Sequence, residues 1–224
     1  QNASCIFIRG NKEDYWLNRR KDQNCDWKSG NRSVMAMIYN YNSLNAKDLD
    51  FFETLPISQS IRFAGMEPVL ACHGTPFENQ KALLSEDLFV QKCEERYIIC
   101  GHTHMQGFVS DGKKKIINAG AVGVPLKSPK KTQYMILTSD GKDWKPEFLS
   151  LEYDVDAVIK EIHESGLWDA SPYWCRITEH LLDTGELPHG TVLNHVMKLN
   201  DYQDPWYNIA AVSYTHLRAH ETAA

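Results

Sequence analysis

Three short segments of the chain place side chains that can bind a metal ion beside a glycine. In chain order they are Gly10-Asn11, His73-Gly74 and Gly101-His102-Thr103-His104. Each follows a short apolar run of the kind that forms a buried strand, so each is expected at a strand end. Ligands of open α/β sheets gather at such ends. The three segments together indicate a shared metal site far more strongly than any one of them does.

The spacing of His102 and His104 suits a pair of metal ions. In an extended backbone, residues two apart point the same way, with Cα atoms about 6.5–7 Å apart. Two imidazoles so placed can converge on cations about 3.5–4 Å apart, and Gly101 permits a tight turn before them. The amide oxygen of Asn11 also suits a hard divalent ion. Taken singly, Asn11 is equally a turn former and His73 a structural histidine.

The apolar pattern predicts the elements that would position these segments. Buried strands are expected at residues 5–8, 60–63, 67–72 and 96–100. Hairpins are expected to turn at Asp111-Gly112 and Asp140-Gly141. Helices are expected at residues 45–56, with Asn45 as N-cap, and at residues 77–91, whereas residues 34–39 fit either a helix or a strand. Helices mixed with strands that end in polar loops favour sheets covered by helices, an α+β fold.

From about Asp154 the pattern changes to helices. Gly166 can end a first helix, Ser171-Pro172 can begin a second, and Gly185 can end it. Two roles remain open for this region: a cap packed on the sheet, or a lid that shapes a substrate pocket. We therefore divide the chain into a domain at residues 1–153, a helical extension at 154–211 and a non-native tail at 212–224.

The tail is set apart because Ser213 to Thr222 resembles a translated sequencing adapter. His216 and His220 stand four residues apart, so on a helix they would share a face and imitate a metal-binding pair. We interpret them as foreign to the native protein and leave them out of the functional argument.

The composition narrows the class of protein. Of 224 residues, 42% are hydrophobic and 24% are charged, as in ordinary globular domains. The net charge of −5 argues against a large nucleic-acid footprint. No apolar stretch approaches the ~18 residues needed to cross a bilayer, so no membrane partner is expected. The six cysteines form no recognisable disulfide framework and are interpreted as reduced thiols, which favours a cytoplasmic location. Nothing in the sequence indicates an oligomeric state.

These motifs resemble those of the calcineurin-like metallophosphoesterase superfamily, in its small prokaryotic phosphodiesterase branch. Its members carry Asp-x-His, Gly-Asp, Gly-Asn-x-Asp/Glu, His and Gly-His-x-His in that order. The last three correspond to residues 10–13, His73 and residues 101–104, and residues 117–123 resemble a family segment beside the site. The likeness covers roughly residues 5–153. Because the chain begins close to the third motif, we expect the first two in a segment that precedes Gln1.

The resemblance implies an αββα four-layer sandwich of two mixed sheets flanked by helices, here without the first strand–helix unit. It also implies two divalent metal ions, most often Mn²⁺ and otherwise Fe, Zn or Mg. Asn11, His73 and His102 would bind one ion and His104 the other. The expected reaction is the hydrolysis of a small phosphate mono- or diester by a hydroxide that bridges the metals.

Two further residues are implied to be catalytic. Lys12 stands where many relatives carry a histidine that assists the leaving group, and a lysine there can contact phosphate as a point charge. Glu13 keeps the acidic residue of the motif. Because the family's bridging aspartate belongs to the motifs expected upstream, we expect this chain alone to be nearly inactive. The alternative function is a non-catalytic protein-interaction scaffold on the same fold.

Overall fold

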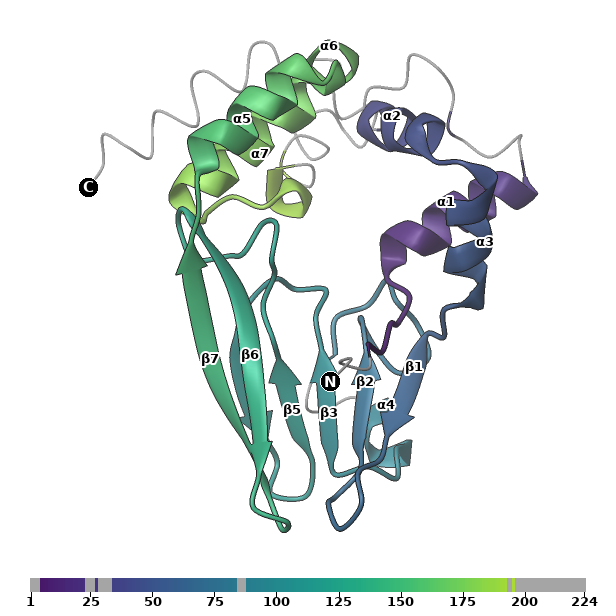
Figure 1. The fold of residues 1–224 in the computed structure, drawn as a ribbon, viewed down its shortest axis with the longest axis vertical. Helices are drawn as coiled ribbons and strands as arrows, with labels where there is room; N and C mark the ends of the chain where they lie inside the picture. Colours follow the sequence, from purple (N-terminus) through teal and green to yellow (C-terminus); the bar gives the residue numbers. More distant parts are fainter. Residues whose placement is uncertain (1–4, 23–26, 28–33, 84–87, 193–194, 196–224) are drawn as a thin grey trace.

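The computed structural model describes residues 5–22, 27, 34–83, 88–192 and 195, which form two β-sheets with helices gathered mainly at one end (Figure 1). The helices are α1 (Asn11–Lys21), α2 (Met35–Ser43), α3 (Ala46–Thr54), α4 (Leu88–Lys92), α5 (Val155–Glu164), α6 (Leu167–Ala170) and α7 (Pro172–Thr184). The strands are β1 (Ser58–Ile61), β2 (Val69–Cys72), β3 (Tyr97–Cys100), β4 (Gly107–Ser110), β5 (Lys115–Asn118), β6 (Lys131–Ser139) and β7 (Trp144–Glu152).

The larger sheet decides where the candidate ligands meet. It has five strands in the order β1-β2-β3-β5-β4, of which β2, β3 and β5 run parallel while β1 and β4 pair antiparallel at the edges. Because parallel strands end at the same edge, His73, Gly101 and Ala119, the residues that follow these strands, come together there. The smaller sheet is the antiparallel pair β6–β7. The predicted α+β class with two sheets is confirmed.

Both faces of the larger sheet are packed. Between the two sheets lie Val69, Tyr97, Ile117 and Trp144. On the opposite face Val90 of α4 joins a second cluster whose members from the sheet are Leu70, Cys72, Ile98, Cys100 and Ile116. Successive residues of a strand point to opposite faces, so the short apolar runs of β2 and β3 feed both clusters. This is the pattern of a parallel sheet that is covered on both sides.

Several local predictions are confirmed. Asn45 caps α3, since its side-chain oxygen accepts the N–H of Lys47 and Asp48, and Asp48 accepts the N–H of Asn45 in return. The hairpins turn at Asp111-Gly112 and Asp140-Gly141 as predicted, and each aspartate accepts main-chain N–H groups within its own turn. Residues 34–39, which fit a helix or a strand, fall in α2 for the most part.

Two local predictions are wrong. Residues 5–8, predicted as a buried strand, are assigned to no strand; Ile6 is 48% exposed and Phe7 is 56% exposed. Phe7 instead packs its ring against Phe51 of α3, with centroids 5.8 Å apart. The helix predicted at residues 77–91 begins only at Leu88 among the described residues. Before it, the Thr75 hydroxyl accepts the N–H of Glu78 at 2.9 Å and organises a loop.

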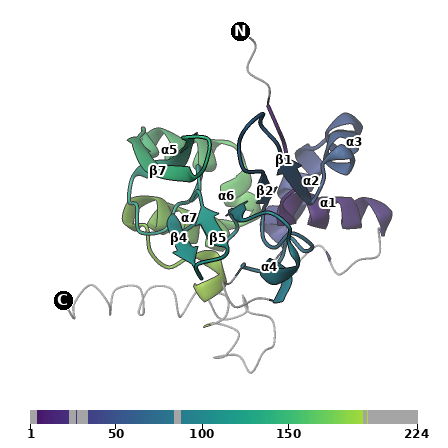
Figure 2. The same ribbon diagram turned by 90° about the horizontal axis from the view of Figure 1, so that it is seen from below.

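The helical extension lies at the strand ends rather than on the face of a sheet (Figure 1). The Asp154 side chain accepts the N–H of Ala157 and so begins α5, while Gly166 (φ 85°) and Gly185 (φ 72°) take left-handed conformations after α5 and α7. The Tyr39 hydroxyl of α2 donates to the carbonyl of Ser165 at 2.7 Å. Seen from below in Figure 2, α6 lies between α5 and α7 on one side and α1–α3 on the other.

Residues 193–194 and 196–211 of the predicted extension, and the predicted tail at 212–224, lie outside the described residues. None of the described helices is long and apolar enough to cross a membrane.

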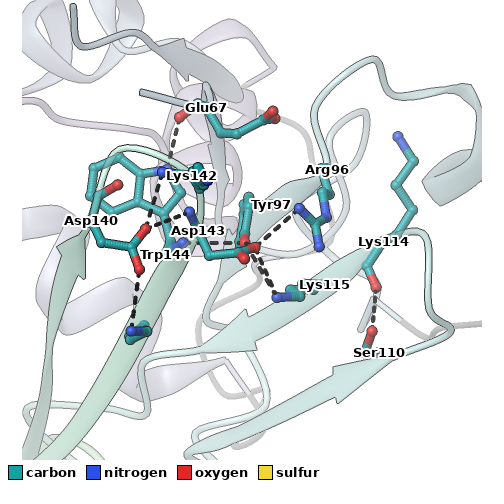
Figure 3. Close-up of polar contacts among 12 residues, drawn as sticks. Glu67, Arg96, Tyr97, Ser110, Lys114, Lys115, Asp140, Lys142, Asp143 and Trp144 are labelled. Atoms are coloured by element: carbon teal, nitrogen blue, oxygen red, sulfur yellow. Dashed lines mark hydrogen bonds and ion pairs between the residues drawn. The ribbon is translucent and has the colours of Figure 1, made fainter. Parts of the chain in front are cut away.

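Asp143, in the turn between β6 and β7, ties the smaller sheet to the larger one (Figure 3). Its carboxylate accepts a hydrogen bond from the Tyr97 hydroxyl at 2.5 Å and forms ion pairs with Arg96 at 3.0 Å and Lys115 at 3.5 Å. The Trp144 N–H donates to the same hydroxyl at 3.2 Å. The Tyr97 hydrogen bond, and then the two cations, hold the pKa of Asp143 below its ordinary value. Tyr97 is fully buried in the core between the two sheets, and its hydroxyl joins that core to the turn at Asp143.

Tyr97→Phe should lower the free energy of unfolding by about 1–2 kcal/mol, because it removes the hydroxyl that Asp143 and the Trp144 N–H share. Urea denaturation followed by tryptophan fluorescence measures the change. Tyr134→Phe is the matched control, since Tyr134 lies in β6 and is 44% exposed. This substitution should lower the free energy of unfolding by less than about 0.5 kcal/mol. Equal losses in the two variants would contradict the role assigned to Tyr97.

Candidate metal centre

Asn11 is placed by the turn that begins α1. Gly10 is the N-cap residue of the helix, and its N–H donates to the Glu13 carboxylate at 2.8 Å. A Cβ atom on Gly10 would lie 2.9 Å from Oε2 of Glu13 and 3.3 Å from Nδ1 of His73, so a side chain at this position would displace one or both of them. Glycine therefore lets the backbone pass close to His73, and Asn11 is the first residue beyond it.

Three of the predicted ligands present their donor atoms to one another. Oδ1 of Asn11 lies 3.0 Å from Nε2 of His73, which lies 3.3 Å from Nδ1 of His102. Two ligands at right angles on a hard divalent ion, each about 2.1 Å from it, would be about 3 Å apart. Among the described residues no three His, Cys, Asp or Glu side chains form a metal-binding group. The amide oxygen of Asn11 is what completes the set with the two histidines.

The prediction of an extended backbone at His102 and His104 is wrong. Both residues take left-handed conformations, with φ of 62° and 59°, in the loop that follows β3. The ring of His104 contacts the Val124 carbonyl through Nδ1 at 3.0 Å, and the Leu126 N–H donates to the His104 carbonyl at 2.9 Å. A carbonyl can only accept, so Nδ1 carries the hydrogen and Nε2 keeps its lone pair. This is the usual orientation of a metal-binding histidine.

Asn118 at the end of β5 braces the loop that carries the two histidines. Its side-chain amide donates to the Gly101 carbonyl at 2.6 Å and to the Thr103 hydroxyl at 2.9 Å, and its oxygen accepts the Gly120 N–H at 2.9 Å. The Gly101 N–H in turn donates to the carbonyl of His73 at 2.9 Å. Asn118 had a signal in the sequence, since it lies in the segment at 117–123 that resembles the family's.

Asp14 and Asn79 support the site, although no pattern in the sequence indicated either of them. The Asn79 side chain, only 1% exposed, donates to the Asp14 carboxylate at 2.8 Å, and the carboxylate lies 2.8 Å from Nε of Arg9. The side-chain Nε–H of Arg9 is not aligned for a hydrogen bond, so this second contact is an ion pair. These contacts hold the first turn of α1 against the loop after His73. Asn79 lies 65 residues from Asp14 in the chain, so no local sequence pattern could predict this contact.

Burial keeps the imidazoles neutral. Burial first, and then repulsion from His102 and His104 when they are protonated, lower the pKa of His73 to about 4. Burial also lowers the pKa of His102 and of His104, and Lys12 acts in the same direction on both. Neutral imidazole is the form that binds a metal ion. The three rings are therefore neutral at neutral pH, and each has a nitrogen lone pair that can bind a metal ion.

Lys12 and Glu13, the two residues predicted to be catalytic, have different relations to the three imidazoles. The Lys12 ammonium acts on all three imidazoles, and its own pKa is lowered by desolvation even though the side chain reaches solvent. Glu13 is engaged by the Gly10 N–H. The structure thus gives Lys12 a charge that reaches the site, and it gives Glu13 a contact that shapes the turn before Asn11.

The fold and this arrangement define a class of protein. Residues 1–142 match the model of the calcineurin-like phosphoesterase superfamily domain. The chain belongs to that superfamily.

An uncharacterized protein of Methanocaldococcus jannaschii is 25% identical over 194 residues, covering 78% of this chain and 74% of that protein. Two solved structures share the fold. A hypothetical protein of Pyrococcus horikoshii has a TM-score of 0.63 at 14% identity, over 84% of this chain and 75% of that one. A metallophosphoesterase of Sphaerobacter thermophilus has a TM-score of 0.57 at 18% identity, over 80% and 76%.

The protein should lose stability as the pH falls from about 6.5 to about 4. His73 has a pKa of about 4 in the folded chain against an ordinary value of 6.5, so the unfolded chain binds more protons between these values. We expect His73 to contribute about 1–3 kcal/mol to this loss. Urea denaturation across the range measures it, and His73→Gln should flatten the dependence. Asn11→Ala, which removes a neighbour that does not titrate, should leave the slope unchanged. Equal slopes for wild type and His73→Gln would contradict the assignment.

Proposed function

We propose that the protein is a metal-dependent phosphoesterase in which Asn11, His73 and His102 bind one divalent cation and His104 binds a second. The observation that carries the proposal is the approach of three donor atoms, Oδ1 of Asn11, Nε2 of His73 and Nδ1 of His102, at 3.0 and 3.3 Å. Nε2 of His104, left free by the contact with Val124, supports the second position. Membership of the superfamily supports a hydrolase.

The donor set favours a hard or borderline ion. Imidazole nitrogen suits Fe and Zn, and amide oxygen suits Mn and Mg. Mn²⁺ is our choice because a mixed set of these donors accommodates it. When bound, two such cations would neutralise phosphoryl oxygens and supply an activated water for in-line attack on phosphorus.

The chain's own residues supply charge and position. The neutral imidazoles are ready to bind cations without first losing a proton to solvent. Lys12, whose ammonium acts on all three rings, is placed to contact a phosphate oxygen as a point charge. We assign Glu13 a positioning role, because its carboxylate holds the Gly10 N–H and thereby the turn before Asn11. The substrate we propose is a small phosphate mono- or diester.

Titration calorimetry with Mn²⁺ tests the metal ligands in this chain. His73→Ala and His102→Ala should each weaken binding by more than about tenfold, because each removes a donor from the cluster. His163→Ala is the control. His163 lies on α5 and pairs with Glu179 of α7, so this substitution should leave the affinity for Mn²⁺ unchanged. Thermal melting shows whether each variant is folded. Undiminished Mn²⁺ binding by folded His73→Ala would refute the ligand assignment.

Hydrolysis of an aryl phosphodiester tests the reaction. Activity is expected in a protein that carries the family's Asp-x-His and Gly-Asp motifs together with this chain, since a bridging carboxylate holds the two cations. It should require Mn²⁺, disappear on chelation and be abolished by His102→Ala. Activity that resists chelation would overturn the metal mechanism. Stable metal binding with no hydrolysis of mono- or diesters would favour the alternative, a non-catalytic scaffold.

A further inference from the structure

A loop joins the candidate metal centre to the helical extension. We call residues 124–130 the connecting loop. On one side it contacts both the ring and the carbonyl of His104. On the other side it holds the end of α7, because the Lys127 N–H donates to the Gly185 carbonyl at 2.8 Å and the Lys130 N–H donates to the Leu182 carbonyl at 2.9 Å. The segment that follows α7 is thereby fixed relative to His104.

His189 lies in that segment, and its ring is held in one orientation. The ring stacks on Trp174 of α7, with centroids 4.7 Å apart and planes 23° apart. Nε2 lies 3.0 Å from the Thr178 hydroxyl and 3.2 Å from the Trp174 carbonyl. The hydroxyl gives its own hydrogen to that carbonyl at 2.9 Å, so Nε2 must be the donor to both oxygens. Nδ1 is then the acceptor nitrogen, and no partner for it is recorded among the described residues.

His189 is close enough to the candidate site to respond to its charges. Burial lowers the pKa of His189 to about 4, and the positive charge of Lys12, with that of His104 when it is protonated, acts in the same direction. Such effects decline with distance and are screened beyond about 10 Å in water. At neutral pH the ring is therefore neutral and offers a lone pair beside a cationic group.

Lys12 and His189 consequently suit different parts of a phosphate ester. An ammonium group only donates hydrogen bonds and matches a phosphate oxygen, which only accepts them when ionised. The neutral Nδ1 of His189 only accepts, so it would repel a phosphate oxygen and bind a hydroxyl group. The part of a phosphate ester that can carry hydroxyl groups is its alcohol.

We propose that His189 is a substrate-positioning residue whose Nδ1 accepts a hydrogen bond from a hydroxyl on the alcohol part of the phosphate ester. The substrate class is thus narrowed to phosphate esters whose alcohol part carries at least one free hydroxyl group. This inference rests on the proposed function, since the ester must be held by the metal centre.

Two phosphonates that cannot be hydrolysed test the proposal: dihydroxypropyl phosphonate and propyl phosphonate, which lacks the hydroxyls. Calorimetry on the Mn²⁺-loaded protein should show the dihydroxy compound binding about five- to tenfold tighter, the value of one hydrogen bond that is made or lost. His189→Phe keeps a ring to stack on Trp174 and should abolish the preference by weakening only the dihydroxy compound. His189→Asn keeps an acceptor and should retain part of the preference. His163→Ala is the control on the surface.

The outcomes separate this inference from the function on which it rests. If His73→Ala and His102→Ala weaken Mn²⁺ binding as expected but the two phosphonates bind equally well, only the role of His189 is overturned. If His189→Phe weakens both phosphonates alike, His189 has a structural role and the inference is again overturned. If Mn²⁺ binding itself does not depend on His73 and His102, the proposed function fails and the inference fails with it.

Discussion

The parallel pairing of β2, β3 and β5 is the constraint on which the candidate site depends. The pairing aligns Ala71 with Ile99 and Cys100 with Asn118, so the three strands end at the same level. A shift by one residue would exchange the two faces of a strand. Such a shift would move Leu70 or Ile98 out of the cluster under α4 and into the face that packs on β6–β7. Apolar burial on both faces of the sheet thus sets the register, and the register sets where the ligands emerge.

Beyond the strand ends, polar contacts take over from apolar packing. The left-handed conformations of His102 and His104 cost about 1–2 kcal/mol each in an unsupported chain. They persist because Asn118 binds the loop before them and the connecting loop binds His104. Residues held in unfavourable backbone conformations by several contacts are typical of functional sites. In this protein the strain lies on two candidate ligands.

Charge and burial are divided across the site in a way that suits an anionic ligand. Burial keeps His73, His102, His104 and His189 neutral, whereas Lys12 retains contact with solvent and brings positive charge to the same region. The helical extension belongs to this arrangement, because the connecting loop joins the end of α7 to His104. A region that the sequence showed only as helices therefore borders the chemistry.

The sequence by itself determined the family, the fold class and the order of the metal-binding motifs, because glycines beside histidine and asparagine after apolar runs are local features. It also determined the cap at Asn45 and the two Asp-Gly turns, which depend on neighbouring residues alone. It could not show that residues 5–8 pack on α3, that the charged segment after Gly10 is helical with only Leu17 buried, or that His102 and His104 are left-handed. Those features, and the link that the connecting loop makes between His104 and the end of α7, were decided by tertiary contacts between residues far apart in the chain, which no local pattern encodes.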